Sequence, residues 1–103
     1  MLSITLTARQ ERELSALAYW IADAHYITER FGHNEPEHQT ADLTVRACFD
    51  ALDALGVPYW MQNAVVMFSE DWRRYKSDNW RRWLNSRTIC GERAYNITVE
   101  GCA

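Results

Sequence analysis

The fold is decided by the stretch PYWMQNAVVMFSEDWRRY, which spans residues 58–75. Its apolar side chains recur at helical spacing, so a narrow apolar stripe runs along a helix that begins at Pro58. The first turns are apolar nearly all round, which is typical of a helix enclosed by other elements. We therefore expect this helix to be the central one, with Phe68 and Trp72 buried. The stripe comprises Met61, Ala64, Val65, Phe68, Trp72 and Tyr75.

One long helix is expected before this stretch. Thr7 and Gln10 have the spacing of a capping box, in which each side chain satisfies a backbone N–H of the other residue. An apolar stripe at helical spacing follows and ends at Gly32, a common helix-terminating residue. The pattern predicts a helix over about residues 8–31. His25 falls on its apolar stripe, so we expect a hydrogen-bonded core histidine.

A second helix is expected after a polar loop. The loop covers residues 32–39, which contain Pro36 and show no periodicity. Thr40 is placed to cap the next helix, which we expect over about residues 41–55, with Gly56 closing it.

The last third of the chain carries weaker signals. Ser77 either caps a short fourth helix over about residues 78–87 or is a minor interruption in one long helix, and we favour the break. Residues 3–6 and 94–100 alternate polar and apolar side chains, which predicts a small two-stranded antiparallel sheet formed by the termini. The sequence therefore predicts a mostly α fold: a single domain over residues 1–103, built as a compact bundle of three to four helices with this small sheet.

Composition narrows the class of protein. At 103 residues, with 48% hydrophobic and 24% charged residues, the chain has the size and balance of one globular domain. No run of about 18 apolar residues could span a membrane. The start of the chain has no basic leader segment, and the three cysteines contain no C-x-x-C pair. We therefore expect a cytoplasmic protein with reduced thiols and no membrane association.

Charge is divided unevenly along the chain. Residues 1–57 carry four basic and nine acidic side chains, whereas residues 58–103 carry seven basic and five acidic ones. Residues 72–87 hold six basic side chains and a single acid, interleaved with tryptophans. One interpretation is an arginine-rich surface for phosphates or for carboxylates of a protein partner. The other is that the tryptophans anchor the core while the arginines are solvated, because Trp80, Trp83 and Leu84 share one helical face and Arg81, Arg82 and Asn85 the other.

Candidate partner-binding residues come from three places. They are the basic segment, two tyrosines seven residues apart on the outer face of the first helix, and two acids of the polar loop. Arg73, Arg74, Arg81 and Arg82 are expected to point away from the core and to contribute more to affinity than to folding. The full set is Trp72, Arg73, Arg74, Tyr75, Lys76, Arg81, Arg82, Arg87, Tyr19, Tyr26, Glu35 and Glu37.

Signals for catalysis or metal binding are weak. No nucleophile motif of the G-x-S-x-G kind occurs, and the four glycines are isolated from one another. His25, His33 and His38 lie near Glu35 and Glu37 in sequence, but their spacing matches no established metal motif. We therefore expect no enzyme activity, no cofactor and no bound metal.

Two functions are consistent with these features of the sequence. The first is a small non-enzymatic protein-binding module, because aromatic and arginine side chains are the usual anchors of interfaces. In general character the chain is similar to small acidic proteins of phages and mobile elements that block defence complexes, such as anti-CRISPR proteins. That similarity implies an inhibitor that docks on a larger protein or protein–nucleic-acid complex. The alternative is a nucleic-acid-binding module that uses residues 72–87, although the overall acidity would repel a polyanion.

Overall fold

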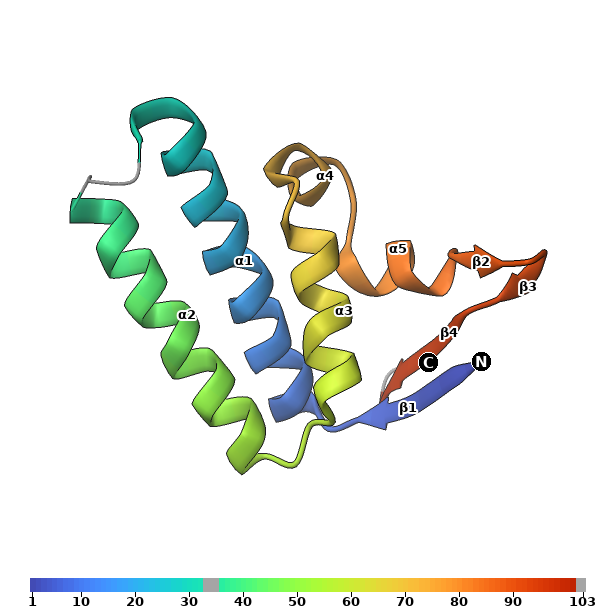
Figure 1. Ribbon diagram of the computed structural model, residues 1–103. Helices are drawn as coiled ribbons and strands as arrows, with labels where there is room; N and C mark the ends of the chain where they lie inside the picture. The colour runs from blue at the N-terminus through green and yellow to red at the C-terminus, as the bar shows by residue number, and fades with distance from the viewer. Residues whose placement is uncertain (33–35, 102–103) are drawn as a thin grey trace.

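The computed structural model describes residues 1–32 and 36–101, which form a helical bundle with a strand pair at one end (Figure 1). Five helices and four strands lie within these ranges. In chain order they are β1 (Leu2–Leu6), α1 (Ala8–Phe31), α2 (Pro36–Ala54), α3 (Tyr59–Ser69), α4 (Trp72–Ser77), α5 (Trp80–Asn85), β2 (Thr88–Ile89), β3 (Glu92–Arg93) and β4 (Tyr95–Val99). No helix within the described ranges is both long and apolar enough to cross a membrane.

Helix α1 is the organising element of the bundle. Its predicted bounds and its capping box are confirmed: the Gln10 backbone N–H donates to Thr7 Oγ1 at 3.1 Å, and the Thr7 N–H donates to Gln10 Oε1 at 2.8 Å. Helices α2 and α3 pack on either side of α1 (Figure 1), with α4 crossing it towards its end. The side-chain amide of Gln10 also donates to the Leu55 carbonyl at 2.9 Å, which ties the start of α1 to the end of α2.

The core lies where α1, α3, α5 and the β1–β4 pair meet. Phe68 is fully buried, as the sequence predicts, and lies on the apolar face of α3 within this core. Burial of these side chains is the main driving force for the arrangement. The largest fully buried residues are Phe68, Leu6, Leu14, Leu17, Leu52, Met61, Leu84, Ile97, Val65 and Ser69.

Helix α2 begins five residues earlier than the sequence pattern predicts. Pro36 is its first residue, because a proline is favourable in the first turn of a helix, where its missing N–H needs no partner. The loop prediction for residues 32–39 is therefore wrong for residues 36–39. Thr40 is not a cap: it lies inside α2, where its hydroxyl donates to the Pro36 carbonyl at 3.1 Å. The structure does not describe residues 33–35.

The long central helix predicted for residues 58–75 is broken into two. Helix α3 ends at Ser69, and α4 begins at Trp72 because the Asp71 side chain caps it, accepting from the Arg73 N–H at 3.0 Å. The change of direction takes Trp72 out of the apolar stripe of α3. Trp72 is consequently only partly buried and faces α1, so its predicted place at the centre of the core is wrong.

The predicted break at Ser77 is confirmed, although Asn79 provides the cap of α5. Its side chain accepts from the backbone N–H groups of Arg81 and Arg82. Trp80 and Leu84 are buried on one face of α5, as expected. Asn85 is partly buried, however, and does not simply face solvent. Its side-chain oxygen accepts a hydrogen bond from the Ile97 N–H at 2.8 Å, and its side-chain nitrogen donates to the Ile97 carbonyl at 2.9 Å.

The two terminal strands do pair, but in parallel and not antiparallel. Strand β1 lies beside β4 with Leu2 opposite Tyr95 and Leu6 opposite Val99. The parallel direction is possible because five helices and a hairpin lie between the strands and return the chain to the Leu2 end. Apolar residues from both strands face the bundle, while Thr5 and Thr98 meet on the other face with their hydroxyls 3.0 Å apart.

A short antiparallel hairpin, β2–β3, was not anticipated. Its two-residue turn is formed by Cys90 and Gly91, whose φ angles of 52° and 80° are both positive. Turns of this kind match the twist of a two-stranded hairpin. The sequence signal was weak because glycine fills only one of the two turn positions.

Candidate functional site

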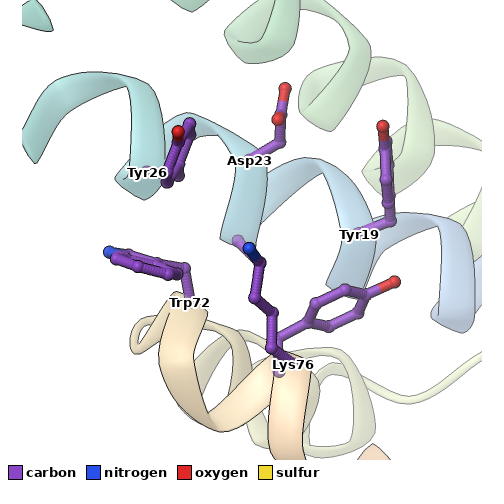
Figure 2. A pocket seen from close by; sticks show the side chains of 7 residues that line it. Tyr19, Asp23, Tyr26, Trp72 and Lys76 are labelled. Carbon is purple, nitrogen blue, oxygen red and sulfur yellow. The ribbon is translucent and has the colours of Figure 1, made fainter. Parts of the chain in front are cut away.

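A groove opens where α4 crosses α1. It has a volume of about 290 Å³. Figure 2 shows that Tyr19, Asp23 and Tyr26 project from α1 and that Trp72 and Lys76 project from α4. We call it the aromatic groove and define it by its lining residues, which are Tyr19, Ala22, Asp23, Tyr26, Trp72, Tyr75 and Lys76.

The helical repeat places these residues on facing surfaces. Tyr19, Ala22, Asp23 and Tyr26 are spaced three or four residues apart, so they share one face of α1. On α4, the residues at 72, 75 and 76 share a face for the same reason. Ala22 is buried between the two tyrosines. Its short side chain leaves the space that a larger residue would fill.

Two edge-to-face ring pairs join the helices at the ends of the groove. Tyr26 and Trp72 have ring centroids 5.1 Å apart with an interplanar angle of 83°, and Tyr19 and Tyr75 have centroids 6.3 Å apart at 70°. Aromatic pairs prefer such T-shaped geometry because the electron-poor edge of one ring meets the electron-rich face of the other. The groove is therefore held open between two braced aromatic pairs.

Glu29 fixes the position of Trp72. Its carboxylate accepts hydrogen bonds from the Trp72 indole N–H and from both terminal nitrogens of Arg73, at 2.7 and 3.2 Å for the latter. The Arg73 guanidinium also lies 4.3 Å from the centroid of the Trp72 ring. The hydrogen bonds from Arg73 and then from Trp72 lower the pKa of Glu29, and the bond to Glu29 raises the pKa of Arg73. This cluster anchors the start of α4 on the last turns of α1.

Lys76 places a cation over the rings of the groove. Its ammonium nitrogen lies 5.3 Å from the Trp72 centroid and 5.8 Å from the Tyr26 centroid. Both distances fall within the range of about 6 Å for cation–π attraction. Asp23, on the facing helix, is partly buried, and its side chain has no hydrogen bond or ion pair with any residue in the described ranges.

Five of the predicted binding residues are therefore brought together. Tyr19 and Tyr26 were singled out from α1, and Trp72, Tyr75 and Lys76 from the basic segment; all line one groove. Sequence reasoning missed Ala22 and Asp23. The signal that could have found Asp23 is its position between Tyr19 and Tyr26 on the same helical face.

The predicted arginine surface is not formed as expected. Arg74 points inward: it donates to the carbonyls of Met67 and Phe68 at 3.1 and 3.3 Å and stacks 4.5 Å from the Trp83 centroid. The expectation that Arg74 is solvent-facing is therefore wrong, because the break after α3 leaves carbonyls that a guanidinium can satisfy. Arg87 covers the same Trp83 ring, also at 4.5 Å.

The remaining predicted residues lie elsewhere. Arg82 is paired with Asp78 at 2.7 Å, and this bond lowers the pKa of Asp78. Arg81 is partly buried on α5, and Glu37 is exposed in the first turn of α2. None of these lines the aromatic groove. Glu35 lies outside the described residues.

A second pocket, of about 320 Å³, lies between α1 and α2, and two histidines are among its lining residues. His25 is exposed there, so its predicted place in the core is wrong: the buried residues of α1 nearest to it are Ile21, Ala22 and Ile27, and His25 falls outside the face that they form. His38 and Asp42 line the same pocket. No group of three histidine, cysteine, aspartate or glutamate side chains in residues 1–32 and 36–101 is arranged to hold a metal ion. His33 lies outside these ranges.

Comparisons with protein-family models, with curated proteins and with solved structures gave no match to this chain. The site is therefore interpreted from its own geometry.

Proposed function

We propose that this chain is a small protein-binding module and that the aromatic groove is the centre of its contact surface. The observation that carries the proposal is the convergence of four aromatic rings from two helices around a groove open to solvent. Tyrosine and tryptophan are enriched among the residues that dominate binding energy at protein interfaces. The other candidate residues that the structure describes do not line this groove.

The rings are also held in place before binding. Trp72 is fixed by its bond to Glu29 and by the stacked Arg73, and Tyr19 packs edge-on against Trp20 with centroids 5.0 Å apart. Ordering a mobile side chain at an interface costs about 0.5–1.5 kcal/mol, so residues that are already ordered avoid that cost. This preorganisation favours a role in recognition.

Protein is favoured over nucleic acid as the partner because few arginines of residues 72–87 are free to contact phosphates. Arg73 and Arg82 each form an ion pair with an acidic residue of the chain, and Arg74 satisfies backbone carbonyls. Non-specific affinity for nucleic acid depends on neutralising phosphates with unpaired cations. The nucleic-acid reading, and the narrower expectation of an anti-CRISPR-like inhibitor, both stay predictions.

We also propose a non-enzymatic role. The residues that line the groove supply aromatic, carboxylate and ammonium groups but no serine or cysteine paired with a histidine base. Of the described cysteines, Cys48 is buried, and burial raises the pKa of its thiol, which lowers the fraction of reactive thiolate. The groove therefore suits binding better than covalent chemistry.

The test is affinity capture from the source cell followed by reconstitution with the purified partner. Tyr19→Ala removes a groove ring that is 47% exposed, and Tyr59→Ala removes a ring that is 80% exposed at the start of α3, outside the groove. We expect Tyr19→Ala to weaken partner binding by about tenfold or more, as the loss of an interface anchor does, and Tyr59→Ala to leave it unchanged. Equal binding by the two variants would refute the proposal. A parallel titration with DNA and RNA at low and moderate salt tests the alternative.

A further inference from the structure

Asp23 is the least satisfied charged group of the aromatic groove. Its side chain is partly buried between Tyr19 and Tyr26 and forms no hydrogen bond or ion pair within the described residues. A carboxylate without a protein partner is available to pair with a cation that is brought to it. The groove therefore contains a ready counter-charge for a positive group.

The ring faces of the groove select the same sign of charge. Aromatic faces carry the negative part of the ring quadrupole and attract cations, especially where water is excluded. The chain's own Lys76 ammonium already lies over the rings of both Trp72 and Tyr26. Figure 2 shows Lys76 reaching from α4 towards α1, between Tyr19 and Tyr26.

Lys76 is a replaceable occupant. It is exposed, its two ring distances of 5.3 and 5.8 Å are near the outer limit for cation–π attraction, and it forms no ion pair within the described residues. Its flexible four-carbon stem can move the ammonium into solvent at little cost. By contrast, Arg73 is held by two hydrogen bonds to Glu29.

We propose that the aromatic groove receives a lysine or arginine side chain of the protein partner, with Asp23 as its counter-ion, and that Lys76 leaves the groove when the partner binds. This inference rests on the proposed protein-binding function and specifies the chemistry of the partner. A volume of about 290 Å³ is at the lower end for ligand pockets, roughly 300–1,000 Å³, and so suits a single side chain.

An acidic partner is the competing occupant. Its carboxylate would pair with Lys76 but would meet the like charge of Asp23 and the negative faces of the rings. A cationic side chain uses Asp23 and the rings together and loses only a weak contact of Lys76. The two occupants therefore predict opposite effects of the same two substitutions.

The experiment measures binding of small probes to the purified full chain by NMR of the Trp72 indole N–H. The probes are acetyl-arginine amide, its neutral isostere acetyl-citrulline amide, and acetyl-glutamate amide. For the wild-type chain we expect a saturable shift with the arginine probe and binding about two- to fivefold weaker with citrulline, as one cation–π contact or exposed ion pair predicts. This comparison requires no variant and so cannot fail through misfolding.

Two charge-removing variants then test the occupant. Lys76→Met keeps the apolar stem and should tighten arginine binding about two- to fivefold, whereas Asp23→Asn should weaken it by a similar factor. The inference would be overturned in favour of an acidic partner if the wild-type chain bound the glutamate probe more tightly than the arginine probe and Lys76→Met weakened binding of the glutamate probe. No saturable shift with any probe would also overturn it, while the capture test with Tyr19→Ala would still decide the proposed function independently.

Discussion

Two nearly identical quartets of sequence open successive short helices with different outcomes. Trp-Arg-Arg-Tyr at residues 72–75 opens α4, and Trp-Arg-Arg-Trp at residues 80–83 opens α5. Each helix is six residues long and is capped by an Asp or Asn side chain that accepts from the first arginine N–H. The local structure of the two quartets is therefore the same.

Both quartets also use their first tryptophan to contact α1. The Trp72 indole N–H donates to Glu29, and the Trp80 indole N–H donates to the hydroxyl of Ser15 at 3.0 Å. Trp80 is only 4% exposed and belongs to the hydrophobic core that includes Leu14 and Leu17 of the first half of α1. Trp72 meets α1 near its end, where the groove is open. The place along α1 at which each tryptophan makes its contact, and not the local sequence, therefore decides which quartet belongs to the core and which to the surface.

The largest expected difference is in the cost of removing each tryptophan. Trp80→Ala should lower the free energy of unfolding by about 3–5 kcal/mol, the usual cost of removing a large core aromatic. Trp72→Ala should cost less than half as much, since its ring is partly exposed. Urea unfolding followed by circular dichroism measures both values. Equal losses would show that the first quartet also belongs to the core.

The second arginines of the quartets provide a smaller contrast. Arg74→Ala should lower the free energy of unfolding by about 1–2 kcal/mol, because it leaves two carbonyls at the end of α3 unsatisfied and uncovers Trp83. Arg82→Ala breaks only an exposed ion pair with Asp78 and should cost less than about 0.5 kcal/mol. If Arg82→Ala proved the more damaging substitution in the same unfolding assay, the structural role assigned to Arg74 would be wrong.

The smallest predicted effect concerns pH and the Glu29 cluster. Because the bonds from Arg73 and Trp72 lower the folded-state pKa of Glu29, their contribution to stability is present above the unfolded pKa. It is lost as the pH falls through the lowered folded-state pKa. An NMR titration should show the Glu29 carboxyl and the Trp72 indole N–H changing together at a pH below the ordinary glutamate range.

The matched controls for this titration are Arg73→Gln and Arg82→Gln. Arg73→Gln should raise the Glu29 midpoint, while Arg82→Gln should raise that of Asp78 and leave Glu29 unchanged. If the titration midpoint of Glu29 did not respond to Arg73→Gln, the ion pair between Arg73 and Glu29 would not be what holds Trp72 in place.

The sequence predicts correctly those helices whose start, end and buried face are set by residues of the helix itself. The capping box and the stripe of α1 are contained within one helix, so its bounds could be derived from the sequence. The break between α3 and α4 could not, because apolar periodicity continues through Trp72 although Asp71 caps a new helix. The strand direction was also undetermined, since the alternation in β1 and β4 suits parallel and antiparallel pairing equally well.

The residues of the groove were predicted individually but not as one site. The sequence singles out Tyr19 and Tyr26 by their place on the outer face of the first helix, and Trp72 and Lys76 by the basic segment that contains them. Their meeting depends on the turn at Asp71, which redirects α4 across α1. The signal for Asp23 is its position between Tyr19 and Tyr26 on the same helical face. That position alone does not single it out, because acidic residues on an outer helical face are common and are usually solvated.

The central claim is that the first quartet belongs to the binding surface and the second to the core. The most direct test is to record the indole N–H signals of the five tryptophans with and without the purified partner. We predict that the Trp72 signal shifts on binding while the signals of Trp80 and Trp83 stay unchanged. Shifts of Trp80 and Trp83 with an unchanged Trp72 signal would contradict the account and move the binding surface to α5.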